Sequence, residues 1–208
     1  MSPSLSKIGF MPGLRERQKQ RRKERIYQTA LRLFRERGFH ETTASDIATQ
    51  AHISRGTFFN YYPYKEAVLL DYGAELLSQL GGLAEQELQA GDPPLEVLRR
   101  LWERLAEVSE RERELLSPLA YELLNPDPER ARAAFESLPL GVLVARLLLP
   151  LWEQGQVRKD QSLERIGRSI ADTYLLVALR WAAYTPERRL KEEMLKFLDL
   201  MLEGVLAR

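Results

Sequence analysis

The sequence predicts an all-α protein of about nine helices, with a three-helix N-terminal unit followed by a larger helical domain. Apolar residues recur at three- and four-residue spacing along most of the 208-residue chain. Glycine, proline and N-cap residues separate these stretches. A chain of this length can bury a sizeable core. We therefore expect a small helical domain over residues 15–65 and a larger helical domain over residues 66–208, behind a disordered leader of residues 1–14.

Charge divides the sequence in two. The net charge is only +1, yet residues 1–65 hold 13 Lys/Arg against 5 Asp/Glu, whereas the remainder holds 18 against 25. A basic end on an acidic body favours a polyanionic partner at that end. The chain has no cysteine, which excludes disulfides and thiolate metal sites.

The first predicted helix covers residues 15–37, with a core-facing stripe, and Gly38 ends it. The stripe consists of Ile26, Ala30, Leu33 and Phe34. A basic arm precedes it, made of Arg15, Arg17, Lys19, Arg21 and Arg22. Such an arm can contact phosphates, enter a minor groove or lie in solvent, and the sequence leaves these open. Either Met1 or Met11 can be the start.

Residues 42–65 predict two short helices joined by a tight turn. Thr43 is a good N-cap with Asp46 at N3, and Ser54 caps the second helix in the same way. Pro63 stops that helix. The apolar positions that can close a small core are Ile47, Ala48, Ala51, Ile53 and Phe58. The polar residues of the second helix then project outward, which is the layout of a helix-turn-helix.

The run SRGTFFNYYPYKEAVL, preceded by TTASDIA, resembles the N-terminal domain of the tetracycline-repressor (TetR) family. The resemblance covers roughly residues 20–75. Two positions depart from the family pattern. His52 stands in place of the usual turn glycine and predicts a positive φ there. Phe59 replaces a tyrosine whose hydroxyl commonly reaches a phosphate in the family.

The side chains of the second short helix divide by chemistry. Arg55 is the candidate for base readout, because a guanidinium can pair with guanine N7 and O6. Phe58 is expected to pack in the core, and Tyr62 to pack with its hydroxyl in contact with water. The resemblance implies that Tyr61 and Lys65 hold the DNA backbone, together with Thr43 and the first amides of its helix. The predicted DNA-contacting residues are Thr43, Ser45, Arg55, Gly56, Thr57, Asn60, Tyr61 and Lys65.

Further along, the pattern predicts a helix that starts near Tyr64 and runs into Gly81-Gly82, and another that follows Asp92. A third covers residues 112–124, with a kink at Pro118. A long helix towards Gln154 follows the turn at residues 125–128, and it is expected to bend near Pro139 and Pro150. Two amphipathic helices at about residues 162–184 and 187–206 close the chain. These two helices can simply fill a core. The resemblance implies instead that they form a homodimer interface, so that two copies bind a palindromic operator on double-stranded DNA.

The resemblance also implies a small-molecule effector, and the residues permit an apolar or amphipathic one such as a lipid-like acyl compound. A regulator without a pocket is the alternative. The candidate lining residues are Trp102, Tyr121, Phe135, Arg146, Trp152, Tyr174 and Trp181. Core packing is an alternative for each aromatic. Arg146 can anchor an anionic ligand, pair with a carboxylate such as Glu122, or extend to the surface.

An enzyme is not expected, and neither a cofactor nor a metal is predicted. His40 and His52 are the only histidines, and no phosphate loop or nucleophile–base arrangement is visible. The longest apolar run, residues 138–152, is too short to span a bilayer. We therefore predict a cytoplasmic DNA-binding regulator with no membrane partner, repression being the family default. A helical protein-interaction module without specific DNA binding is the alternative.

Overall fold

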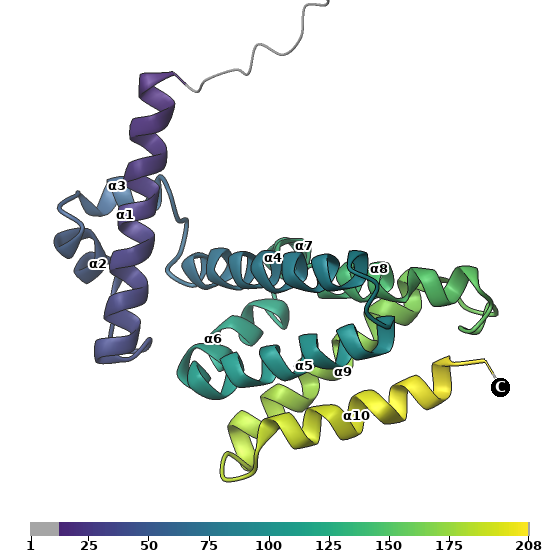
Figure 1. The fold of residues 1–208 in the computed structure, drawn as a ribbon. Coiled ribbons are helices and arrows are strands. Elements are labelled where there is room, and N and C mark those ends of the chain that lie inside the picture. Colours follow the sequence, from purple (N-terminus) through teal and green to yellow (C-terminus); the bar gives the residue numbers. More distant parts are fainter. Residues whose placement is uncertain (1–12, 208) are drawn as a thin grey trace, which may run out of the picture. The chain divides into compact units, whose positions relative to one another are not determined.

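The computed structural model describes residues 13–207, which form ten α-helices in two compact units, Met1–Val68 and Leu69–Arg208 (Figure 1). The predicted all-α class is confirmed, since the only extended pairing among the described residues is an isolated bridge between Val157 and Leu206. Most of the predicted leader lies outside the described residues, and Leu14 already belongs to the first helix.

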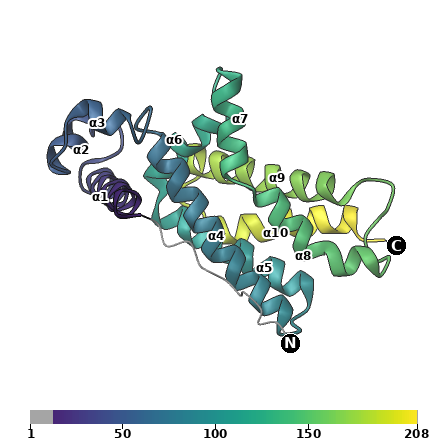
Figure 2. The same ribbon diagram turned by 90° about the horizontal axis from the view of Figure 1, so that it is seen from above.

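The first unit is built on α1 (Leu14–Arg37), with α2 (Ala44–Gln50) and α3 (Arg55–Phe59) packed on one side of it (Figure 2). Gly38 ends α1 with φ 92°, a backbone conformation that favours glycine. The buried side chains form one small core and include Ile26, Ala30, Leu33, Phe34, Ile47, Ala48, Ala51, Phe58 and Tyr62. The predicted stripe of the first helix therefore faces this core.

The second unit contains α4 (Ala67–Gln89), α5 (Pro94–Arg111), α6 (Arg113–Leu123), α7 (Pro128–Ser137), α8 (Leu140–Glu153), α9 (Leu163–Tyr184) and α10 (Leu190–Val205). The two first residues of α4 still belong to the first unit, so this helix is continuous across the boundary. One helix more is present than expected, because the long helix predicted towards Gln154 is two helices, α7 and α8, bent by 40°. Pro139 is the N-cap of α8, where its missing N–H and fixed φ start a new helix rather than bend an old one. Pro118 and Pro150 do lie inside helices, as predicted.

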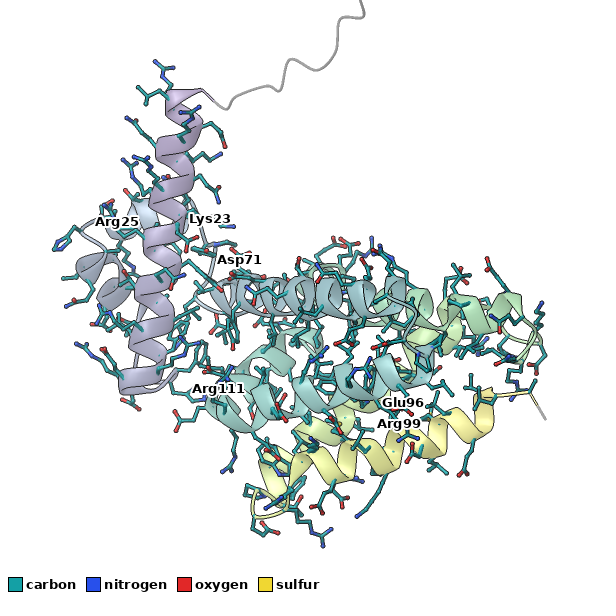
Figure 3. All side chains as sticks on the ribbon, viewed as in Figure 1. Lys23, Arg25, Asp71, Glu96, Arg99 and Arg111 are labelled. Atoms are coloured by element: carbon teal, nitrogen blue, oxygen red, sulfur yellow. The ribbon has the colours of Figure 1, made fainter. Side chains whose placement is uncertain are left out.

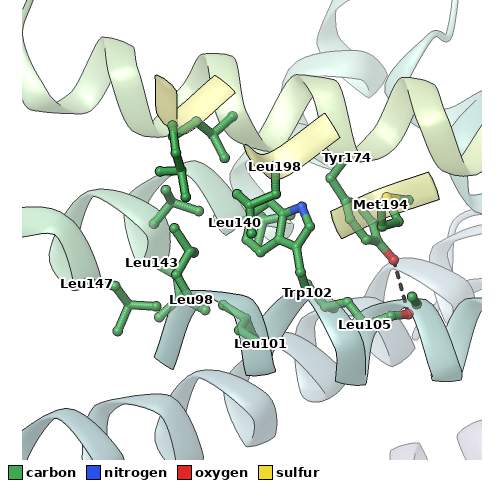
Figure 4. Packing of buried hydrophobic residues seen from close by; sticks show 14 of the residues in the cluster. Leu98, Leu101, Trp102, Leu105, Leu140, Leu143, Leu147, Tyr174, Met194 and Leu198 are labelled. Carbon is green, nitrogen blue, oxygen red and sulfur yellow. Dashed lines mark hydrogen bonds between the residues drawn. The ribbon is translucent and has the colours of Figure 1, made fainter. Parts of the chain in front are cut away.

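The core of the second unit is lined by leucines of α5 and α8 and by residues of α9 and α10 (Figure 4). Trp102 and Tyr174 meet edge to face in it, with ring centroids 5.8 Å apart. The Tyr174 hydroxyl lies 2.7 Å from the Ser109 hydroxyl and donates to the Leu105 carbonyl at 3.2 Å. Burial raises the pKa of Tyr174 to about 12, so the phenol is neutral and both polar groups are satisfied.

α8 and α9 pack in extensive contact, and their backbones come unusually close. A Cβ placed on Gly167 lies 2.3 Å from the Gly141 carbonyl oxygen and 2.9 Å from the Ala145 nitrogen. Only glycine fits at position 167 in this arrangement. The small residues thus fix the two helices as a rigid pair.

α10 packs against α5 and α9 of its own chain. Its apolar stripe is buried there: Leu190, Met194, Leu198, Leu202 and Val205. The Glu110 carboxylate accepts from the Leu190 amide at 2.6 Å and so satisfies a free donor at the start of α10. Beyond α10, the Val157–Leu206 bridge ties the end of the chain to the α8–α9 connection.

Among the described residues, no single helix is long and apolar enough to cross a bilayer; only α7 and α8 taken together, as a bent pair, would suffice by length and composition.

Candidate nucleic-acid interface

The segment between α1 and α2 is held by hydrogen bonds from two side chains. The buried Thr42 hydroxyl bonds the Gly38 carbonyl at 2.9 Å and the Leu33 carbonyl at 3.3 Å. Lys65 Nζ donates to the Phe39 carbonyl at 2.8 Å and to the Thr42 carbonyl at 3.0 Å. The same ammonium lies 4.2 Å from the centre of the Phe39 ring. Lys65 therefore fixes the segment that leads into α2.

α2 starts with the capping box that the sequence predicts. The Asp46 amide donates to Thr43 Oγ1 at 3.1 Å, and the Thr43 amide donates to Asp46 Oδ2 at 2.9 Å. The side-chain hydrogen bond from Thr43, followed by its backbone hydrogen bond, holds the pKa of the Asp46 carboxyl below its ordinary value. Ser45 is exposed in this first turn. The start of α2 is thus fixed by its cap, with the Ser45 hydroxyl exposed beside it.

The turn between α2 and α3 contains His52 at φ 53°, the positive value predicted for this position. The Ile53 amide closes the turn by donating to the Ala48 carbonyl at 3.0 Å. Ser54 then caps α3, accepting from the Thr57 amide at 3.0 Å. Both N-caps of the helix-turn-helix are confirmed.

α3 separates its buried and exposed side chains as predicted for packing. Phe58 is fully buried and Tyr62 is 2% exposed. Arg55, Gly56 and Asn60 are exposed, whereas Thr57 and Tyr61 are half-buried. The Thr57 hydroxyl is also engaged, lying 2.8 Å from the Ser54 hydroxyl. The residues with most freedom to contact a ligand are therefore Arg55 and Asn60.

One contributor was missed in the sequence. The exposed Phe59 ring lies 5.5 Å from the Arg55 guanidinium carbon, an arrangement typical of a cation–π pair. Phe59 also packs edge to face on the buried Phe58 ring. The departure from the family tyrosine at this position therefore removes a hydroxyl but leaves a platform that orients Arg55. The four-residue spacing of Arg55 and Phe59 on one helix was the available signal.

The seven candidate effector-pocket residues do not gather at one place. Trp102 and Tyr174 meet in the core, and Trp181 is buried with its indole N–H donating to the Arg188 carbonyl at 2.7 Å. Trp152 packs on the edge of the core. Tyr121 and Phe135 are exposed.

Arg146 is exposed and pairs with Glu85 at 3.1 Å. The carboxylate considered for it, Glu122, is buried and is held by two nitrogens of Arg130 instead. Of the three roles left open for Arg146, pairing with a glutamate is observed, with Glu85 in place of Glu122, and the pair lies at the surface. No group of three or more potential metal ligands occurs in the described part of the chain.

Comparison with known proteins identifies the family. Residues 26–72 match the model described as bacterial regulatory proteins, tetR family, and residues 74–204 match the C-terminal domain of TetR/AcrR family transcriptional repressors. The chain belongs to the TetR family. The resemblance read from the helix-turn-helix therefore extends over both units, and the family's members are DNA-binding transcriptional regulators.

Three relatives illustrate this membership. The FadR repressor of Thermus thermophilus, solved in complex with lauroyl-CoA, is 63% identical, with a TM-score of 0.86 over 89% of this chain and 96% of that chain. The uncharacterized HTH-type transcriptional regulator YerO of Bacillus subtilis (strain 168) is 30% identical over 75% of this chain. The matched region spans only 55% of the length of YerO. The repressor KstR2 of Mycolicibacterium smegmatis is 27% identical over 88% of this chain and 90% of its own length.

The hydrogen bonds of Lys65 predict an effect on stability. Lys65→Met should lower the free energy of unfolding by about 1–3 kcal/mol, since two charge-assisted hydrogen bonds to backbone carbonyls are lost. Urea denaturation followed by circular dichroism measures this change. Lys159→Met is the matched control, because Lys159 is exposed. Equal stability of the two variants would contradict the anchoring role.

Proposed function

We propose that this chain is a homodimeric repressor that binds a palindromic operator and is released from it by a long-chain acyl-CoA thioester. The observation that carries the proposal is the 63% identity to the T. thermophilus FadR–lauroyl-CoA structure over nearly the whole of that chain. Both ends of the proposal have a physical basis in this structure. The first unit presents a capped helix start and an exposed arginine, and the second encloses a leucine-rich core.

For the DNA end, each predicted residue except Thr57, whose hydroxyl is engaged by Ser54, receives a role from its position. Arg55, oriented by Phe59, reads a base edge, and Asn60 lies one turn further along the same helix. Thr43 and Ser45 bring the start of α2 against a phosphate, and Tyr61 supports the backbone beside it. Gly56 is exposed and has no side chain, which allows close approach of the duplex. Lys65 is a positioning residue for this surface, because its ammonium already bonds two carbonyls.

The operator is tested by selecting genomic fragments that the protein retains. We expect an inverted repeat among them, and Arg55→Ala should then alter the sequence preference by about 1–3 kcal/mol at one position per half-site. Asn125→Ala is a control outside the first unit. If Arg55→Ala weakens binding equally on the selected repeat and on a scrambled duplex, Arg55 does not read bases.

For the effector end, the apolar core offers the lining that an acyl chain needs. Leucines of α5 and α8 face one another there, among them Leu98, Leu101, Leu143 and Leu147 (Figure 4). Burying one methylene contributes about 0.8 kcal/mol, so each added carbon that the core accommodates should tighten binding severalfold. α4 runs without a break from the first unit into the second, and it is the element through which occupancy of the core can reach α3.

The effector is tested by titrating lauroyl-CoA, acetyl-CoA and free CoA onto the complex of protein and selected repeat. Lauroyl-CoA should release the duplex, because only it adds a long buried chain, whereas acetyl-CoA and CoA should leave the complex intact. Fluorescence anisotropy of the labelled duplex follows the release. Equal effects of all three compounds, or of none, would refute an acyl-CoA effector.

For the dimer, the exposed apolar side chains favour α8 and α9 as the interface. Of the nine large exposed hydrophobic residues described in the second unit, four lie on these two helices: Val142, Leu149, Leu176 and Tyr184. Three more, Tyr121, Leu124 and Phe135, lie on α6, directly after it and on α7. α10 exposes only Leu200, because its apolar stripe is used within the chain. The sequence predicted an interface of residues 162–184 and 187–206, which correspond to α9 and α10. The interface proposed here retains α9 and has α8 in place of α10.

Two charge substitutions distinguish these pairings. Leu176→Glu should convert the dimer to monomers, since a carboxylate would be buried without a partner. Leu200→Glu on α10 should leave the dimer intact. Both leucines are more than 60% exposed, at 70% and 62%, so neither change should disturb the fold of the subunit. Sedimentation velocity measures the oligomeric state of each variant. If only Leu200→Glu is monomeric, the interface contains α10 and the proposal of α8 and α9 is wrong.

A further inference from the structure

α1 extends well beyond the core that it supports (Figure 1). Its first buried residue is Ile26, twelve residues after it begins at Leu14. The preceding residues carry seven Lys/Arg and two Glu, and all are exposed except the half-buried Lys23. At 1.5 Å per residue, Arg15 lies about 16 Å along the helix from Ile26. The basic arm seen in the sequence is thus a rigid helical overhang.

The cations of this overhang lie on two different faces. Arg15, Lys19 and Arg22 follow one another at spacings of four and three residues. Ile26 and Leu33 continue this line along the helix, and both are fully buried against the helix-turn-helix. We name Arg15, Lys19 and Arg22 the α1 cation stripe.

The other three arginines form a row on the opposite side of α1. Arg17, Arg21 and Arg25 are four residues apart, and the row continues to the exposed Gln28 and Arg32. This row therefore follows the solvent side of α1, away from the core of the first unit.

Lys23 provides an independent check on the rotation of the overhang. It lies four residues after Lys19, and its ammonium is 5.4 Å from the centre of the Tyr62 ring. Tyr62 lies three residues after the end of α3 and is buried. Lys23 and Arg25 are both labelled in Figure 3. The cation stripe therefore leaves α1 on the side that carries α2 and α3.

We infer that the α1 cation stripe is a second DNA-contacting surface, which binds backbone phosphates beside the segment occupied by α3. This inference rests on the proposed DNA-binding function. Three exposed cations along one line of a rigid helix match the charge of a polyanion, and no acidic residue interrupts that line. A helix about 10 Å wide does not enter a minor groove, which admits extended arms, so the contact is to phosphates and not to bases.

The test compares two triple variants of equal charge. Arg15→Gln/Lys19→Gln/Arg22→Gln removes the stripe, and Arg17→Gln/Arg21→Gln/Arg25→Gln removes the opposite row. Binding to the selected repeat and to a scrambled duplex of the same length is measured between about 50 and 200 mM salt. A slope of about 0.9 in log K against log salt is lost for each phosphate contact. In a dimer, the stripe variant should therefore flatten the slope by about 3–5, and the control by less than half of that.

Each outcome decides one question. Wild-type protein that binds neither duplex refutes the proposed function itself. Wild-type binding with equal slopes for the two triple variants refutes the stripe, since total charge alone would then explain the loss. A stripe variant that keeps its affinity for the scrambled duplex but loses the repeat would overturn the assignment to phosphates. The double variant Arg15→Gln/Lys19→Gln, further from the core, preserves the test if the triple variant is unstable.

Discussion

The packing of two very short helices on α1 is the constraint on which the DNA-facing unit depends. α2 has seven residues and α3 five, lengths at which an isolated helix does not form in water. They persist because Phe58 and Ile47 are fully buried among the apolar side chains of α1. The N-caps at Thr43 and Ser54 and the carbonyl bonds of Lys65 then fix where each helix starts. The position of the α3 surface therefore depends on how α1 is rotated about its axis.

The rotation of α1 about its axis also fixes the orientation of its N-terminal half, because both halves belong to one continuous helix. The stripe that buries Ile26 and Leu33 determines which side of α1 carries Arg15 and Lys19 some turns earlier. Core packing thus orients surface charge over a distance that exceeds the Debye length at physiological salt. A flexible arm would have to be ordered by the duplex at an entropic cost, whereas a helical overhang is already ordered.

The sequence predicted the features that depend on neighbouring residues. The capping box, the Ser54 cap, the positive φ of His52 and the end of α1 at Gly38 each follow from a side chain within a few positions of the backbone it serves. Features that depend on distant residues were not predictable in the same way. Lys65 was expected at a phosphate from the family resemblance. Its observed partners, the Phe39 and Thr42 carbonyls, lie more than twenty positions earlier, where no local pattern indicates them. At Pro139 the sequence predicted a bend, but the structure has a break between two helices. A proline can bend a helix or end it, and packing decides which occurs.

The aromatic residues of the second unit show the same limit. Trp102 and Tyr121 look alike in a helical pattern, yet one is 2% and the other 67% exposed. Which of them faces a ligand depends on how the helices pack, and periodicity does not contain that information.

The last two helices of the chain have similar apolar patterns but pack differently. α10 gives its whole apolar stripe to α5 and α9, so it belongs to the core of the subunit. α9 shares one side with that core and meets α8 at Gly167 on another, while Leu176 stays exposed. Since the backbones of α8 and α9 touch at Gly141 and Gly167, the pair cannot compress further. If the proposed acyl-CoA effector enters the core, the helices that make room for it are therefore ones other than this pair. α4 is the helix that continues into the first unit, so in this proposal its displacement is what would reach the DNA-facing helices.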